Sequence, residues 1–113
     1  MSEEGFARTP EPPYWAVIFT SKRTAVDEGY AAMSAEMERL AAEQPGYLGI
    51  ESARDAGLGL TVSYWASDKA AKGWKKVAAH LEAQRLGRER WYESYEVRVA
   101  KVERAYGWQR PQR

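Results

Sequence analysis

The sequence predicts an α+β fold in which one antiparallel sheet of four strands carries two helices on one face. Two stretches, near residues 26–43 and 67–84, repeat apolar residues at the three- and four-residue spacing of an amphipathic helix. Four shorter stretches, rich in β-branched and aromatic residues, lie around them in the order β-α-β-β-α-β. This order is that of the ferredoxin-like, split β-α-β fold.

A leader and a first strand open the chain. Residues 1–13 contain three prolines and scattered charges without any period, so we expect a flexible leader. Residues 14–20 (YWAVIFT) have the composition of a strand. Their side chains are apolar on both faces, which predicts a central position in the sheet.

The first helix is expected to run from Asp27 to about Glu43. Asp27 and Glu28 place negative charge in its first turn, where it complements the helix dipole. Pro45 and Gly46 end it, because proline cannot continue a helix and glycine adopts the turn that follows. One apolar stripe comprises Val26, Tyr30, Met33, Met37 and Leu40.

Two strands are expected over residues 47–54 and 58–66, because apolar side chains alternate there with small or polar ones. The three residues between them, Asp55 to Gly57, are typical of a tight turn. The two strands are therefore predicted to pair antiparallel as a hairpin.

The second helix begins after Ser67 and Asp68, which are suited to cap its free amides. Gly73 within it costs about 1 kcal/mol relative to alanine, which indicates that another group approaches closely there. The predicted buried stripe comprises Ala70, Ala71, Trp74, Val77, Ala78 and Leu81.

The last strand is expected over residues 95–106, followed by a short tail at 107–113. Tyr95, Val97 and Val99 share one face, but Ala100 and Val102 carry the apolar pattern on the other. Such a phase slip predicts a bulge or a bend.

The composition of the chain limits the classes of function that it can have. A chain of 113 residues forms one domain, here 14–106. The 17 basic residues interleave with 16 acidic ones, so a single-sign face for nucleic acid or an anionic membrane is not expected. The absence of cysteine excludes disulfides, thiolate nucleophiles and zinc–cysteine sites. With no apolar signal region and no run of membrane-spanning length, we expect a cytoplasmic protein.

A homodimer is expected from the distribution of apolar residues. Five tryptophans and seven tyrosines are many large rings for so small a monomer. The first and last strands are apolar on both faces, yet the helices cover one face alone. The same face of a second copy is the economical cover for the other.

Three stretches carry a resemblance to a known family: PGYLGIES, SYWASDKAAKGW and VRVAKVERAYG. They resemble the antibiotic-biosynthesis monooxygenase family of the dimeric α/β-barrel superfamily, over about residues 14–106. The motif at Trp65-Ala-Ser-Asp, followed nine residues later by Trp74, is the most specific part. The resemblance implies a dimeric α/β barrel. Members include monooxygenases without a cofactor, haem-degrading enzymes and proteins without known activity.

His80 and Trp74 are the catalytic candidates. His80 is the single histidine of the chain, and histidine serves as a general base near neutral pH or as a haem ligand. A helix-edge histidine without a role, and core packing for Trp74, are the structural alternatives. Trp65, Tyr64 and Tyr92 are candidates for binding a small apolar or aromatic molecule, with rim or interface packing as the alternative for the tyrosines.

Three functions follow as hypotheses. The first is a cofactor-independent monooxygenase that deprotonates an aromatic or polyketide-like substrate in an apolar pocket, so that its anion reduces O2. The second is a haem-binding or haem-degrading protein that uses His80. In the haem-degrading branch a first-strand asparagine accompanies the tryptophan and histidine, and residues 15–20 contain none. The third is a non-catalytic dimeric binding or scaffold protein, which predicts that side chains fill the space near Trp74.

The basic run at Arg85, Arg88 and Arg90 is a further candidate, for a carboxylate or phosphate. Glu89 and Glu93 interrupt it, so a solvated surface of paired charges is the favoured interpretation. No metal-ligand spacing, nucleophilic triad or phosphate-binding glycine loop accompanies it.

Overall fold

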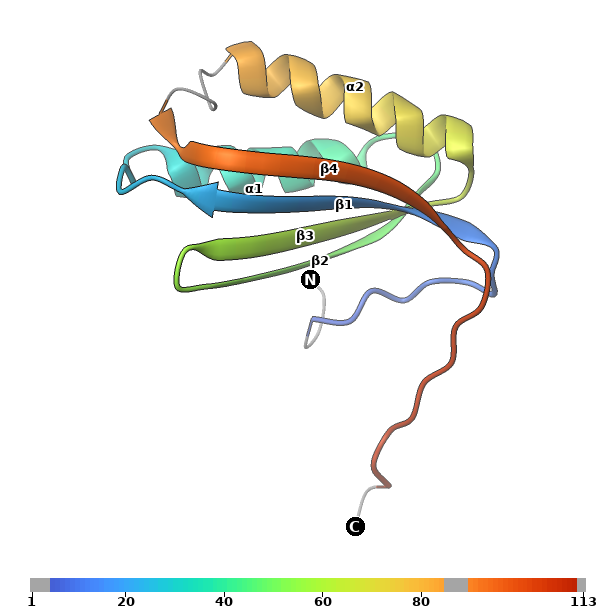
Figure 1. The fold of residues 1–113 in the computed structure, drawn as a ribbon. Coiled ribbons are helices and arrows are strands. Elements are labelled where there is room, and N and C mark those ends of the chain that lie inside the picture. The colour runs from blue at the N-terminus through green and yellow to red at the C-terminus, as the bar shows by residue number, and fades with distance from the viewer. Residues whose placement is uncertain (1–4, 85–89, 112–113) are drawn as a thin grey trace.

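A computed structural model describes residues 5–84 and 90–111 of the chain. It confirms the predicted order and the antiparallel four-stranded sheet. Figure 1 shows both helices on the same side of that sheet. The elements are β1 (Tyr14–Arg23), α1 (Tyr30–Ala42), β2 (Tyr47–Asp55), β3 (Leu58–Trp65), α2 (Asp68–Gln84) and β4 (Tyr92–Val102).

The strand order across the sheet is β2-β3-β1-β4, so β1 is central, as its two apolar faces predict. Val17 of β1 lies opposite Ser63 of β3 and Val99 of β4. Because residues directly opposite one another share a face, this register defines two surfaces. One faces the helices, and the other, the open face, does not.

The core lies between the helices and the sheet. Trp65 of β3 is fully buried, and its ring stacks on Trp74 of α2 with centroids 5.8 Å apart. Val17, Ala41 and Ala71 complete this buried cluster. Burying two indole rings contributes several kcal/mol, since each aromatic side chain removes 150–250 Å² or so from water.

Helix α1 begins at Tyr30 rather than at Asp27, because contacts of the preceding residues hold them in a turn. Arg23 donates to the Asp27 carboxylate at 2.7 Å and to the Val26 carbonyl at 2.9 Å, which holds both residues in a turn. Gly29 then adopts φ +83°, a left-handed conformation that favours glycine. Val26 is consequently outside the helical stripe and exposed.

The start of α2 and the hairpin agree with the sequence in most respects. Ser67 Oγ accepts a hydrogen bond from the Ala70 amide at 3.0 Å, which confirms the cap. The hairpin loop is two residues, Ala56 and Gly57, rather than three. Both have positive φ, as a type I′ turn requires.

The side chain of Leu81 and the residues Arg85 and Arg88 lie outside the described part of the chain.

The bulge that the sequence predicts near Ala100 lies elsewhere in the last strand, at its start, where Lys22 pairs with Ser94 and Arg23 with Tyr92. Strand β4 begins at Tyr92, and it pairs with β1 from Ser94 to Val102 without a register shift. The apolar residues change from one face of the strand to the other, because Val97 packs among the helix-side residues and Ala100 lies on the open face. The shifts occur instead between Lys22 and Arg23 and between Tyr47 and Gly49.

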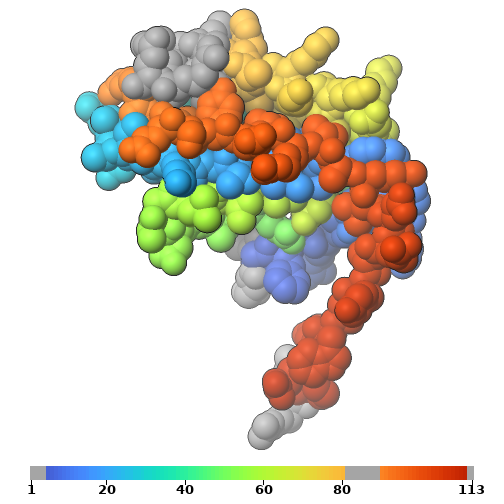
Figure 2. All heavy atoms as spheres, in the orientation of Figure 1, coloured from blue at the N-terminus to red at the C-terminus, as the bar shows by residue number. Residues whose placement is uncertain are grey.

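Both terminal segments lie away from the helices. Residues 5–13, which the sequence predicts to be a flexible leader, pass along the open face (Figure 1). There the Ala7 amide donates to Glu51 at 2.9 Å and Thr9 donates to the Tyr14 hydroxyl at 3.1 Å. The segment after β4 projects from the body as an arm (Figure 2) on which Trp108 is 74% exposed.

Candidate functional site

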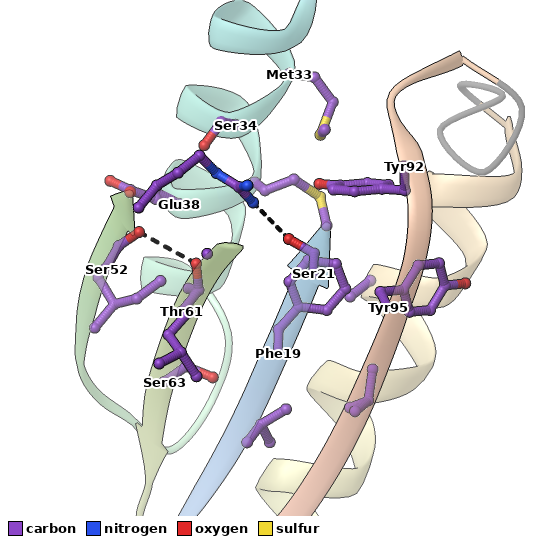
Figure 3. A pocket seen from close by; sticks show the side chains of 18 of the residues that line it. Phe19, Ser21, Met33, Ser34, Glu38, Ser52, Thr61, Ser63, Tyr92 and Tyr95 are labelled. Atoms are coloured by element: carbon purple, nitrogen blue, oxygen red, sulfur yellow. Dashed lines mark hydrogen bonds between the residues drawn. The ribbon is translucent and has the colours of Figure 1, made fainter. Parts of the chain in front are cut away.

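A cavity of about 280 Å³ lies between the two helices and the sheet. Its size is near the lower end of the 300–1,000 Å³ or so that is typical of small-molecule pockets. Figure 3 shows side chains from α1 and from all four strands around it. Its lining includes Val17, Phe19, Ser21, Tyr30, Met33, Ser34, Met37, Glu38, Ser52, Arg54, Gly59, Thr61, Ser63, Trp74, Lys75, Ala78, Tyr92, Tyr95 and Val97.

Aromatic rings form the walls. At one end Phe19 contacts Tyr92 edge-on and Tyr95 at a tilt, with centroids 5.5 and 5.3 Å away. At the other end stands Trp74, which is held by its stack on Trp65. In Figure 3 the Tyr92 hydroxyl points toward the side where Ser21 lies, whereas that of Tyr95 points away. Flat faces at both ends suit a flat aromatic molecule.

Small hydroxyl side chains form the floor. Ser21 and Ser63 are each 2% exposed. Ser63 accepts from Trp65 Nε1 at 2.8 Å, so its own hydroxyl hydrogen is available to donate. Ser52 and Thr61 hydrogen-bond across β2 and β3 at 3.2 Å, the left-hand dashed line in Figure 3. These hydroxyls can donate to an oxygen of a bound molecule.

Three charged side chains lie around the rim. Glu38 of α1 is the one carboxylate among the described lining residues, and Arg54 of β2 and Lys75 of α2 are the two cations. Arg54 donates to Ser21 Oγ at 2.5 Å and to the Gly57 carbonyl at 3.2 Å. Burial, and then the negative charge of Glu38, raises the pKa of Tyr47 nearby. Glu38 itself is an exposed residue at this rim.

A family model described as antibiotic biosynthesis monooxygenase matches residues 19–86, which is more than half of the chain. The chain belongs to this family. In sequence, the chain is similar to the uncharacterised protein YqjZ of Bacillus subtilis strain 168. It is 54% identical over 99 residues, which cover 87% of each protein.

Two solved structures share the family fold. One is a mutant of SnoaB, a cofactor-independent oxygenase from Streptomyces nogalater, with a TM-score of 0.67 and 12% identity over 81% of this chain and 95% of that one. The other is NE2512, a protein of unknown function from Nitrosomonas europaea. Its TM-score is 0.64 at 14% identity, over 91% of this chain and all of that one. At such identities the likeness shows the fold alone.

The structure brings two of the five predicted site residues to the cavity of this family member. Trp74 and Tyr92 line it. Trp65 lies behind Trp74, fully buried, and acts as its support. The other two candidates, Tyr64 and His80, lie elsewhere.

Tyr64 lies on the open face, because it opposes Ala16 of β1. Its hydroxyl donates to Glu51 Oε1 at 2.8 Å. Burial, and then this hydrogen bond, raises the pKa of Tyr64 to about 12, so the phenol is neutral at physiological pH. His80 is exposed on α2 and is not among the lining residues. The described lining therefore offers no imidazole as a base or a haem ligand.

Sequence reasoning missed Ser21, Arg54 and Glu38. Ser21 follows directly after the strand expected over residues 14–20, whereas β1 continues to Arg23. Arg54 is the last residue of the strand expected over 47–54, and Glu38 lies outside the predicted apolar stripe and is exposed, as that pattern implies. The signal that could have found Arg54 is Gly59, its partner across the predicted hairpin, because a buried glycine in a strand marks a close approach.

A metal-binding group and a membrane-spanning helix are both absent from the part of the chain that the structure describes. Among them no group of three or more histidine, aspartate and glutamate side chains could hold a metal ion. Within the same part of the chain, neither helix has the length and apolar character needed to span a membrane.

Proposed function

We propose that this protein is a cofactor-independent monooxygenase that oxidises a small aromatic, polyketide-like substrate in the cavity between its helices and sheet. The cavity itself carries the proposal. It lies beside Trp74, has flat aromatic ends and hydroxyl groups along its floor, and contains one carboxylate at its rim. A scaffold whose own side chains fill this space is the alternative, and the open volume favours a ligand-binding protein.

The chemistry assigns Glu38 as the base. It would remove a proton from an acidic C–H or O–H of the bound ring, and the Ser63 hydroxyl is placed to hydrogen-bond the resulting oxyanion. The anion passes an electron to O2, and the two radicals combine in a carbon–oxygen bond. Loss of water from the peroxide leaves a carbonyl. A CH2 group and O2 thereby become C=O and H2O, so O2 is reduced by four electrons that the substrate supplies.

Oxygen uptake with anthrone as the probe tests this function. We expect uptake above the uncatalysed rate, with one atom from labelled O2 in the product. Glu38→Gln should lower kcat by roughly a hundredfold, because a positioned base contributes about 10²–10⁴ in rate. Glu43→Gln is the matched control, since Glu43 is exposed like Glu38 but pairs with Arg39 and does not line the cavity. Uptake no faster than without protein, or equal loss in both variants, would contradict the proposal.

The proposed reaction uses no haem. A haem titration of the wild type and of His80→Ala therefore distinguishes the oxygenase proposal from the haem-binding one. We expect haem titration to give the same visible spectra for the wild type and His80→Ala, because the exposed His80 does not line the cavity. A saturable Soret shift that His80→Ala loses would replace the oxygenase proposal with the haem-binding one.

We further propose that the working form is a homodimer joined through the open face. Leu58 and Leu60 of β3 are 50% and 44% exposed there. Ile18 and Val62, which oppose one another in the register, lie on the same face. A second copy of the same face would remove this apolar surface from water.

A further inference from the structure

The side chain of Arg54 extends across the sheet, from β2 past β3 to β1. Arg54 of β2 lies opposite Gly59 of β3, and Gly59 lies opposite Ser21 of β1. The three residues thus form one row on the face that the helices cover. The guanidinium spans this row, and its Nη2 donates to Ser21 Oγ at 2.5 Å, the bond that ends at Ser21 in Figure 3.

Gly59 makes room for this guanidinium. A Cβ at Gly59 would overlap three atoms of the Arg54 head group. Gly59 is buried and its φ is outside the left-handed region, so its backbone alone does not call for glycine. The absence of a side chain at this position therefore serves the placement of Arg54 against the cavity.

The guanidinium keeps hydrogen-bonding capacity and an uncompensated charge. Of its five N–H groups, the described contacts use one for Ser21 and one for the Gly57 carbonyl. Among the described residues, neither Arg54 nor the second rim cation, Lys75, is in an ion pair. The described lining thus holds two cations and the single carboxylate of Glu38. This excess of positive charge favours an anion.

We propose that the Arg54–Ser21 end of the cavity binds the carboxylate of an aromatic acid. Phe19 and Tyr92 would pack against the ring next to that carboxylate. Ser21 and Val17 are four residues apart on β1, or about 13 Å at 3.3 Å per residue. The far end of a two- or three-ring acid would then lie near Ser63, which opposes Val17, and near Trp74. This substrate class rests on the proposed function, because it assigns the anchoring group of the molecule that is oxidised.

Binding of a matched ligand pair tests the inference without any turnover. Isothermal titration would compare 2-naphthoate with its methyl ester, which has the same rings and no charge. We expect the wild type to bind the carboxylate about tenfold more tightly than the ester. Arg54→Gln should bring the two affinities within about twofold of each other, with the affinity for the ester unchanged.

Two further variants separate this site from a general effect of charge or a fault in folding. Gly59→Ala keeps the arginine but forces its head group to move, so it should also lose most of the carboxylate preference. Lys69→Gln removes a positive charge from an exposed position that does not line the cavity, and it should keep the tenfold preference. Circular dichroism and thermal unfolding would verify that each variant is folded.

The outcomes are distinguishable from those of the oxygen-uptake experiment. Equal affinities in the wild type, or a preference that survives Arg54→Gln, would overturn the anion site even if anthrone is oxidised. A preference that Arg54→Gln abolishes supports the site even if no oxygen is consumed. If neither ligand binds to the wild type, the inference is overturned.

Discussion

At the scale of single residues, Trp74 belongs both to the core and to the cavity. It is 7% exposed, stacks on Trp65 at an interplanar angle of 22°, and lines the open volume with its other side. Core packing and ligand binding are therefore not alternatives for this residue. The same indole that packs in the core also forms a wall of the cavity.

Trp74→Ala should lower the free energy of unfolding by about 3–5 kcal/mol, because it removes a buried ring and leaves a larger void. Urea denaturation followed by circular dichroism measures this. Trp74→Phe, which keeps an aromatic ring, should lower it by less than half as much. A change near zero in Trp74→Ala would show that the ring lines the pocket without supporting the core.

Tyr64 predicts a dependence of stability on alkaline pH. Its pKa is raised to about 12 from the usual 10.0, chiefly by burial and then by the hydrogen bond to Glu51. The folded state therefore holds this proton more tightly than the unfolded state does. Its contribution to stability is fully present below about pH 10 and is lost as the pH rises toward about 12.

Urea denaturation at a series of pH values from about 9 to 12 measures this contribution. The unfolding free energy of the wild type should fall more steeply over this range than that of Tyr64→Phe. Tyr106→Phe is the control, because Tyr106 is fully exposed and its phenol contacts water in both states. Parallel curves for the wild type and Tyr64→Phe would contradict the prediction.

At the scale of elements, Gly73 of helix α2 serves neither packing nor the cavity. The sequence suggested a close approach at Gly73. The structure shows an exposed position with no other group within 4 Å of the place where a Cβ would lie. The glycine is therefore a local weakness of the helix rather than a contact.

Gly73→Ala should raise the free energy of unfolding by about 0.5–1 kcal/mol, because alanine loses less backbone entropy in a helix. Thermal denaturation would show the gain as a higher Tm. Gly46→Ala is a useful contrast and should destabilise, because Gly46 has φ +84° and a Cβ there would press on Ala70. A lower Tm for Gly73→Ala would indicate that a partner contacts this position.

At the scale of the whole molecule, the two faces of the sheet serve different purposes. The face under the helices holds the core and the cavity. The open face exposes Leu58 and Leu60 next to the leader, while the arm after β4 carries the exposed Tyr106 and Trp108. Both apolar surfaces would be covered by association with a second copy.

Static light scattering at micromolar concentration should give a mass twice that of one chain. Leu60→Glu should reduce it to that of a monomer, because it would bury a charge at the centre of the proposed contact. Lys69→Glu, on the exposed side of α2, should leave the dimer intact. A monomeric wild type at this concentration would rule out the dimer.

The arrangement of elements could be predicted from the sequence because it depends on local periodicity. Tyr30, Met33 and Met37 repeat at helical spacing, and the hairpin strands alternate around a glycine turn, so each element and its buried side follow from neighbours in the chain. Trp74 and Tyr92 were found as candidates for the same reason, since large rings on buried faces line whatever space the core leaves.

Tertiary structure alone decided which polar groups meet in the cavity. Arg54 and Ser21 are 33 residues apart and come together through the register of three strands, which local patterns do not encode. The sequence made Tyr64 and His80 candidates for the same site as Trp74. The structure separates them, since successive strand residues point to opposite faces and a helix turns through 100° or so at each residue. The sequence by itself thus determined the fold and its aromatic core, and the packing of distant strands determined the chemistry of the site.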